Sequence, residues 1–485
     1  MSQIPSHQTQ AQKLYSSDGY RDAEAALLRL LVQQSSEIQG VRSAVHPQLD
    51  EANRQRMQEF MKHRGRDLYY PYLSSGIGNG PLIELNDGSV KYDMITGIGI
   101  NFFGHSHPEL MKEVIRAAPS DVMQGNLQPG VEATAVLQEI LKRVGPKSRL
   151  KHAWLMCSGT MVNEVALKIV RQKKSPATKI LAFEDCFAGR STAMQEITDN
   201  PGYRQGQPVY GEVHYLPFYQ QKLGLERSIQ ITVDHLDWIA SRYPGMFAAM
   251  MIELVQGEGG FRYAPREWYV AVFDAAKRHG IAIWIDEVQS FGRTGELFAY
   301  QTFGLDEYVD VVTVGKMLQS CLALYTEEFN PKPGLVAGTF SGSSATLRSA
   351  ARVLQLLDEE GHLGPNGKTQ LLSKRFQDHL KHLQESLKDP NGKSLIEEIR
   401  AVGGMIAFQP MDGSMDTIKK VLLKLYDLGV VAFYCGHGPY FIRMLPPLGA
   451  MSDAHVDEVC QLIGKALRSV SEQGSQAANK GGASG

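Results

Sequence analysis

The sequence has no excess of charge of either sign. Its 50 lysine and arginine residues are balanced by 52 aspartate and glutamate residues, which leaves a formal net charge of −2. Proteins that bind nucleic acid or anionic membranes usually carry a basic excess or a dense run of basic residues. Neither is present here, so we expect neither nucleic acid nor a membrane among the partners.

Cysteine is scarce, and its five occurrences are scattered without Cys-x-x-Cys spacing: Cys157, Cys186, Cys321, Cys435 and Cys460. An odd, dispersed set fits neither a disulfide framework nor a zinc site, and it favours a reducing compartment. No stretch approaches the roughly 20 apolar residues of a membrane span. Residues 1–12 are polar and lack the apolar core of a signal peptide. We expect a soluble, cytoplasmic protein without a bound metal.

The order of apolar patterns predicts the fold class. Between about residues 95 and 334, short apolar segments alternate with helical periodicity, which is typical of a doubly wound, mostly parallel α/β sheet. Strands are expected at 152–157, 179–183, 247–253, 282–286 and 309–314. Later residues instead favour a smaller α+β domain, with helices at 345–358 and 368–387 and strands at 404–408 and 440–444.

These patterns divide the 485 residues into five segments. The expected boundaries are a helical arm at 1–65, the first part of the small domain at 66–95, the large domain at 96–335, the C-terminal small domain at 336–472 and a disordered tail at 473–485. Within the arm, residues 1–20 are expected to lack regular structure. The tail is rich in Gly, Ala, Ser and Gln, a composition that favours disorder.

An acid and a lysine follow two neighbouring strands. The apolar segment 281–285 ends at Asp286, and the segment 309–314 leads through a glycine to Lys316. Parallel strands bring such terminal side chains to the same edge of a sheet. Pyridoxal phosphate requires a lysine for a Schiff base and a carboxylate that keeps its ring nitrogen protonated. The pair therefore predicts a pyridoxal-phosphate site, although Lys316 taken alone would be interpreted as a solvated surface lysine.

A P-loop ATPase is the alternative for a strand that ends in Asp-Glu. That class needs a Gly-x-x-x-x-Gly-Lys-Ser/Thr motif before the acid. The nearest approach is at residues 367–369, where His362 occupies the position of the first glycine and the segment lies C-terminal to the acids. The sequence disfavours this alternative.

A phosphate site is expected where Ser158, Gly159 and Thr160 follow one strand and open a helix. The free N–H groups and the dipole of a helix N-terminus favour an anion. The alternative is an ordinary Ser/Thr helix cap. Phe187, just after the next strand, is placed where an aromatic ring could cover a flat cofactor, with plain core packing as its alternative.

Taken together, these motifs resemble the class III aminotransferases of fold type I pyridoxal-phosphate enzymes, from about residue 69 to residue 467. The motifs, in order, lie at residues 97–108, 158–160, 187–190, 253–260, 286–295, 316, 338–340 and 443–448. The relatives include acetylornithine, ornithine, 4-aminobutyrate and lysine ε-aminotransferases. The resemblance implies a large pyridoxal-phosphate-binding domain with a smaller α+β domain.

The resemblance also implies roles for individual residues. Lys316 forms the Schiff base, Asp286 pairs with the ring nitrogen, and Gln289 reaches the ring hydroxyl. The full implied set of cofactor-binding residues is Ser158, Gly159, Thr160, Phe187, Glu253, Asp286, Val288, Gln289, Lys316 and Thr339. Of these, Val288 and Phe187 would cover the two ring faces.

Substrate and subunit contacts follow from the same resemblance. Arg443 would bind a substrate carboxylate and pair with Glu258, while Arg190 would bind a second carboxylate. Thr339 would reach the phosphate of a neighbouring subunit in a homodimer with shared active sites. The expected reaction moves an amino group from an amine or ω-amino acid to a 2-oxo acid, with 2-oxoglutarate as acceptor. A decarboxylase or aminomutase of the same fold, and a non-catalytic relative, are the alternatives.

Overall fold

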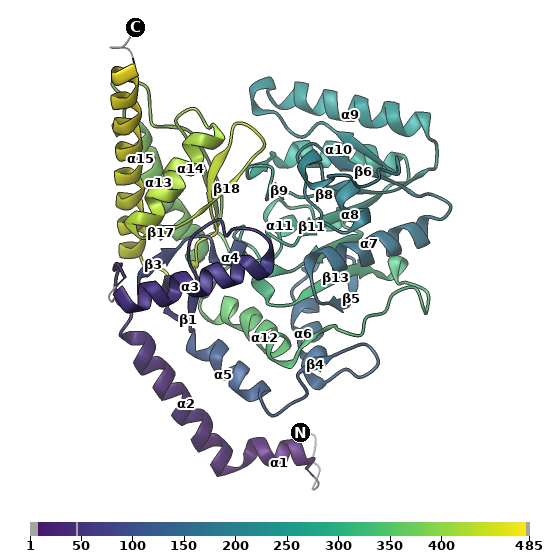
Figure 1. Cartoon of the computed structure of the whole chain (residues 1–485). Helices are drawn as coiled ribbons and strands as arrows, with labels where there is room; N and C mark the ends of the chain where they lie inside the picture. Colours follow the sequence, from purple (N-terminus) through teal and green to yellow (C-terminus); the bar gives the residue numbers. More distant parts are fainter. Residues whose placement is uncertain (1–7, 45–46, 482–485) are drawn as a thin grey trace.

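A seven-stranded sheet with strand order β5-β13-β12-β11-β8-β6-β7 forms the centre of the larger domain (Figure 1). The computed structural model describes residues 8–44 and 47–481. The strands are β5 (Leu150–Met156), β6 (Lys179–Phe183), β7 (Val213–Leu216), β8 (Phe247–Ile252), β11 (Ala282–Glu287), β12 (Val311–Val314) and β13 (Cys321–Thr326). Only β13 is antiparallel to its neighbours, so the predicted mostly parallel sheet is confirmed.

Helices cover both faces of this sheet, which explains why the central strands β8, β11 and β12 are buried along their whole length. In β11, Ala282 and Trp284 pack into the hydrophobic cluster beneath α7 (Gly159–Lys174). The alternating Ile283 and Ile285 point to the opposite cluster, which includes α10 (Arg266–Arg278).

The register of β11 with β12 positions the site. The two strands are parallel, and Asp286 is the direct neighbour of Thr313. The chain leaves β12 two residues before Lys316. The acid and the lysine therefore emerge at the same carboxyl edge, as the sequence predicts.

Residues 96–359 contain further helices and short strands that connect the strands of this sheet. The helices are α4 (Thr96–Gly99), α5 (Pro108–Ala117), α6 (Val131–Leu141), α8 (Thr192–Ile197), α9 (Leu225–Arg242), α11 (Ala299–Thr302) and α12 (Ser344–Glu359). The short strands are β4 (Met123–Gln124), β9 (Val255–Gln256), β10 (Arg262–Tyr263) and β14 (Gly342–Ser343). The 3-10 helices are η1 (Pro201–Tyr203), η2 (Gln221–Leu223), η3 (Asp306–Tyr308), η4 (Lys316–Leu318) and η5 (Glu327–Phe329).

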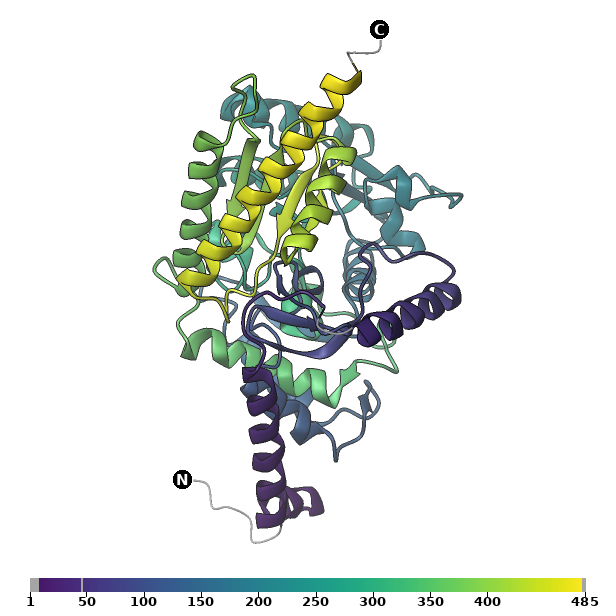
Figure 2. The same ribbon diagram turned by 60° about the vertical axis from the view of Figure 1, so that its left-hand side comes forward.

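A second, antiparallel sheet with order β15-β16-β19-β18 forms the smaller α+β part. Its strands are β15 (Ile396–Val402), β16 (Met405–Pro410), β18 (Phe433–Cys435) and β19 (Phe441–Met444). Figure 2 shows its helices lying side by side over this sheet. They are α13 (Lys368–Ser386), α14 (Met415–Leu428) and α15 (Asp453–Gly481).

A third sheet joins a segment near the start of the chain to a strand of the C-terminal part. It has the order β1-β2-β3-β17 and comprises β1 (Ser74–Asn79), β2 (Leu82–Leu85), β3 (Val90–Asp93) and β17 (Val430–Val431). The parallel pairing of β17 with β3 joins the segment before the large sheet to the C-terminal part.

Two terminal segments differ from the sequence-based expectation. The tail predicted to be disordered over 473–485 continues α15 to Gly481, and only residues 482–485 lie outside the described residues. Alanine, glutamine and lysine in this stretch have good helix propensity, which a composition-based expectation of disorder overlooks. Within the expected loose segment 1–20, residues 10–16 form α1 (Gln10–Ser16), whose start is fixed by a Thr9–Gln12 capping box.

The N-terminal arm is otherwise helical, as expected. It consists of α1, α2 (Asp18–Ser36) and α3 (Pro47–Arg64), and α1 and α2 extend away from the body in Figure 1. Among residues 8–44 and 47–481, we find no helix whose length and hydropathy would allow it to cross a bilayer.

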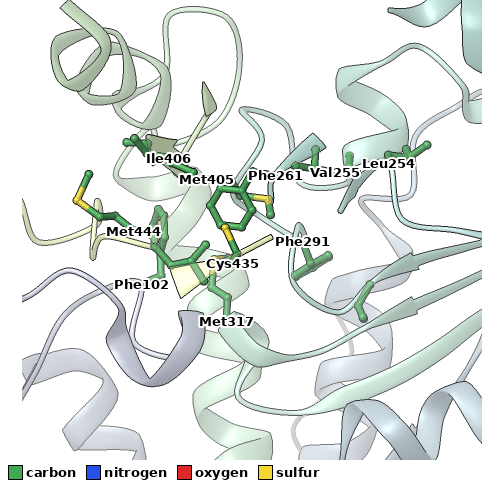
Figure 3. Packing of buried hydrophobic residues seen from close by; sticks show 14 of the residues in the cluster. Phe102, Leu254, Val255, Phe261, Phe291, Met317, Met405, Ile406, Cys435 and Met444 are labelled. Atoms are coloured by element: carbon green, nitrogen blue, oxygen red, sulfur yellow. The ribbon is translucent and has the colours of Figure 1, made fainter. Parts of the chain in front are cut away.

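One hydrophobic cluster spans both parts of the chain. Figure 3 shows Met405 and Met444 of the smaller part packed in the same cluster as Phe261 and Met317 of the larger part. Such a continuous core holds the antiparallel sheet firmly against the edge where Lys316 lies.

Candidate active site

Lys316 occupies an unusual backbone conformation at the sheet edge. It is the first residue of η4, and its φ of 47° lies in the left-handed region that side chains other than glycine rarely adopt. Such strain persists only where the surrounding structure fixes it, and it concentrates at functional sites. The turn delivers the lysine side chain into a cavity.

This cavity has a volume of about 360 Å³, within the usual range of small-molecule sites. Its lining residues are Ile100, Ser158, Gly159, Thr160, Asn163, Phe187, Ala188, Gly189, Glu253, Asp286, Val288, Gln289, Lys316, Gln319, Ser320 and Cys321. The fold thus brings together every predicted cofactor-binding residue except Thr339.

Asp286 lies buried at the end of β11 and accepts two hydrogen bonds. The backbone N–H of Val288 donates to Oδ1 at 2.8 Å, and Asn163 Nδ2 donates to Oδ2 at 2.7 Å. Burial raises the pKa of Asp286 to about 6, against the opposing effect of these two donors and of Lys316. The carboxylate is therefore the predominant form at neutral pH.

Glu253 forms a second buried acid beside the first. It accepts hydrogen bonds from the backbone N–H groups of Phe187 at 2.8 Å and Gly257 at 3.0 Å. Burial, and then the nearby charge of Asp286, raises its pKa to about 8. Burial therefore opposes ionisation of both acids, and the donors from Val288 and Asn163 and the charge of Lys316 counteract it at Asp286.

Burial also shifts the pKa of Lys316. It lowers the pKa of the amine to about 8, an effect that Glu258 opposes and Arg443 reinforces. A neutral amine is the form that can attack a carbonyl or accept a proton. The lysine therefore reaches its reactive form much closer to neutral pH than an exposed lysine does.

The start of α7 forms the opposite wall. Ser158 caps this helix by accepting from the N–H of Met161, and the first turn keeps unpaired N–H groups next to the cavity. A Cβ on Gly159 would lie 2.8 Å from Val288 Cγ1, so only glycine lets the helix approach this closely.

The residues present fit pyridoxal phosphate. A helix N-terminus can take its phosphate, a buried carboxylate can take its ring nitrogen, and Lys316 can bind its aldehyde carbon. The buried Oε1 of Gln289 has no hydrogen-bond partner in the described residues, so it is free to accept from a ligand.

Charged residues that interact electrostatically with Lys316 come from both parts of the chain. Glu258 Oε1 pairs with Arg443 Nη1 at 2.7 Å, and the same nitrogen donates to the backbone oxygen of Gly257 at 3.1 Å. Burial opposes ionisation of Glu258, but Arg443 and Lys316 outweigh it and lower the pKa of this glutamate. The guanidinium of Arg190 lies 4.1 Å from the ring centre of Tyr203.

Thr339 is the exception among the predicted cofactor-binding residues. It is exposed and lines a separate, wider cavity of about 1130 Å³, together with the segments 120–132 and 337–340. A single chain therefore does not place Thr339 beside Lys316.

Several cavity residues escaped the sequence-based prediction. Asn163 lies one helical turn after Gly159 on α7, so the 3.6-residue spacing was a usable signal for it. The segment 319–321 carries no comparable signal, because a left-handed turn at Gln319 determines its placement, and Ile100 enters the cavity from the end of α4.

Comparison with known proteins agrees with this site. An acetylornithine aminotransferase of Mycolicibacterium smegmatis is 29% identical over 392 residues, covering 78% of this chain and 89% of that protein. A probable 4-aminobutyrate aminotransferase of Bacillus subtilis is 29% identical over 431 residues, covering 82% and 95%.

Solved structures show the same fold. A lysine aminotransferase from M. tuberculosis superposes with a TM-score of 0.75 at 21% identity, covering 85% of this chain and 99% of that one. A Bacillus anthracis aminotransferase gives a TM-score of 0.75 at 17% identity, covering 88% and 100%.

The family described as Aminotransferase class-III matches residues 71–467, which is most of the chain. The matched region contains the lysine, the buried carboxylate and the helix N-terminus around the cavity, and the enzymes of this family depend on pyridoxal phosphate. The chain therefore belongs to the class III aminotransferases and is a pyridoxal-phosphate-dependent transaminase.

Proposed function

We propose that this enzyme moves an amino group from an amine or ω-amino acid to a 2-oxo acid, with 2-oxoglutarate as the acceptor. The donor class comprises ornithine-, acetylornithine-, lysine- and 4-aminobutyrate-like molecules. The relatives named acetylornithine and 4-aminobutyrate aminotransferase support this class.

The Glu258–Arg443 pair, with a buried arginine and a partly exposed glutamate, carries the proposal. A 2-oxo acid presents a carboxylate next to its reacting carbon, and arginine is suited to bidentate carboxylate recognition. An ω-amine presents only hydrogen there, and an unpaired buried charge would then be costly. Glu258 neutralises Arg443 when the donor is bound and releases it when the oxo acid arrives.

Lys316 and Asp286 have complementary roles in this proposal. Bound pyridoxal phosphate supplies a ring that accepts the electron pair left when the donor carbon loses its proton. Asp286 keeps the ring nitrogen protonated. Lys316 holds the cofactor covalently before the donor arrives, and its released Nζ then moves the proton at the donor carbon.

The other cofactor residues contact the phosphate, the ring faces and the ring hydroxyl. Ser158, Gly159 and Thr160 hold the phosphate, while Phe187 and Val288 cover the two ring faces. Gln289 contacts the ring hydroxyl. The carboxyl group of Glu253 holds the Phe187 loop in place by accepting a hydrogen bond from the backbone N–H of Phe187.

Arg190 is proposed to bind a second carboxylate at the far end of the donor. Its guanidinium lies over Tyr203, and its charge contributes to the lowered pKa of Glu258, so it is close enough to act in the same pocket. A donor with a distal carboxylate would gain a charge-assisted hydrogen bond there.

We propose that the active unit is a homodimer in which Thr339 reaches the phosphate of the neighbouring subunit. The exposure of Thr339 in a wide cavity supports this arrangement. We also propose that residues 96–335 form the cofactor-binding domain and that 66–95 and 336–472 form the small domain, supported by the pairing of β3 with β17. Free cysteines in the described residues support a cytoplasmic location.

Two measurements test the proposal. Borohydride treatment of the yellow holoenzyme should fix a pyridoxyl group on the peptide that contains Lys316, and a label on another lysine would overturn that assignment. Half-reaction spectra with the four donor types and 2-oxoglutarate should identify the donor. Release of carbon dioxide in step with cofactor conversion would instead indicate a decarboxylation-coupled reaction.

A further inference from the structure

Asn163 makes two short hydrogen bonds from one atom. Its Nδ2 donates to the backbone oxygen of Ala188 at 2.7 Å and to Asp286 Oδ2 at 2.7 Å, and the side chain is 2% exposed. Both partners are acceptors without a proton to give. The amide orientation is therefore determined by its surroundings, because a flipped amide would direct its oxygen at a carbonyl and a carboxylate.

The position of Asn163 links three parts of the cavity. It lies on α7, one turn from the phosphate-binding start of that helix, and its amide reaches both Ala188, next to Phe187, and Asp286 at the end of β11. A shift in any one of these walls changes a hydrogen bond of the same NH₂ group. The three walls are thereby held in a common geometry.

We propose that Asn163 is a positioning residue that acts through Asp286 and keeps this carboxylate ionised and aimed into the cavity. The inference rests on the proposed role of Asp286 as the partner of the ring nitrogen.

Oδ2 of Asp286 accepts its hydrogen bond from Asn163, which is the donor to this oxygen in the described part of the chain. The backbone N–H of Val288 donates to Oδ1 of Asp286. A donor to the charged form of a buried acid lowers its pKa, and burial alone raises it. Without Asn163, the pKa of Asp286 rises above its present value of about 6 and the neutral acid becomes populated near neutral pH.

Two variants of Asn163 are expected to give opposite pH dependence. In Asn163→Ala the lost donor favours the neutral acid, so cofactor affinity relative to wild type falls most near pH 6 and recovers toward pH 9. A lost charge-assisted hydrogen bond corresponds to a roughly ten- to hundredfold weaker affinity.

Asn163→Asp is a nearly isosteric change, and it should reverse the direction in which relative cofactor affinity changes with pH. At low pH the new acid keeps a proton and can still donate to Asp286. As the pH rises, two adjacent carboxylates repel each other and disrupt the site. Relative affinity should therefore fall with rising pH, and this variant tests the inference even if Asn163→Ala fails to fold.

The measurement is titration of the cofactor-free protein with pyridoxal phosphate between pH 6 and pH 9, followed by absorbance and protein fluorescence. Leu167→Ala is the matched control, because Leu167 is a buried residue of the same helix that does not line the cavity. It should lower thermal stability without giving the affinity ratio a pH dependence. If both Asn163 variants lose affinity for pyridoxal phosphate by a factor that does not change with pH, the inference is overturned.

A double-mutant cycle with Asp286→Ala shows whether Asn163 acts through the carboxylate. We expect Asp286→Ala to weaken binding and the added Asn163→Ala to change little further. If Asp286→Ala binds like wild type, the proposed role of Asp286 is wrong and the inference fails with it. If Asp286→Ala is weakened but the two losses simply add, only the inference about Asn163 is overturned.

Discussion

Arg443 Nη1 lies 2.7 Å from Glu258 Oε1, in an ion pair whose arginine side chain is 1% exposed and whose glutamate is 20% exposed. Arg443 comes from β19 of the smaller part, and Glu258 comes from the loop that follows β9 of the larger part. The more exposed glutamate is the member that can rotate away toward solvent. The pair therefore has the asymmetry that a releasable partner requires.

Removing either member should bias the two half-reactions in opposite directions. Arg443→Ala is expected to slow the 2-oxo acid half-reaction by roughly ten- to a hundredfold, because a charge-assisted hydrogen bond to the carboxylate is lost. Glu258→Ala should instead slow the donor half-reaction. Single-turnover absorbance measurements of each half-reaction provide the test. Equal losses in both halves for Arg443→Ala would refute the switch and favour an α-amino donor.

The titration of Lys316 should respond to the same pair. In the cofactor-free protein the fraction of neutral amine rises with pH through about 8, so the rate of reductive methylation at Lys316 should rise and then level off. Glu258→Gln removes a charge that raises this pKa, and the midpoint should move down. Arg443→Ala removes one that lowers it, and the midpoint should move up. Mass spectrometry of the Lys316 peptide gives the rates, and shifts of the same sign would contradict this electrostatic account.

Gly159→Ala should weaken cofactor binding through a single contact. The new Cβ would lie 2.8 Å from Val288 Cγ1, and such overpacking costs about 1–3 kcal/mol. Adding Val288→Ala should restore part of the affinity, measured by titration of the cofactor-free protein. Gly19→Ala is the control, since a Cβ there meets no atom within 4 Å. A double variant no better than Gly159→Ala would show that the contact with Val288 is not the cause.

Thr339 is predicted to act across a subunit interface. A Lys316→Ala chain mixed with a Thr339→Ala chain should give heterodimers with one site that retains both residues. Activity recovered after confirmed subunit exchange, up to one site per heterodimer, would support the shared site. No recovery would mean that Thr339 serves its own chain or neither.

Five of the seven strands of the main sheet, and the edge at which its acid and lysine lie, were predicted from the sequence. The segments that became β6, β11 and β12 are apolar on both faces and end at polar residues, and this pattern is local. Because carboxyl ends of parallel strands share one edge, adjacent placement of Asp286 and Lys316 followed without further information. The start of α7 was likewise predictable, because Ser158 is a residue type that commonly caps helix N-termini.

Contacts between side chains far apart in the sequence could not be deduced from local sequence patterns. The Glu258–Arg443 contact joins residues 185 positions apart, and it was expected from the family resemblance because no local pattern indicates it. The antiparallel insertion of β13 between β5 and β12 depends on long-range pairing. Asn163 acquired its two acceptors because α7, the loop at Ala188 and β11 pack together. Such contacts depend on how separate elements pack, and local propensity and periodicity contain no information about that packing.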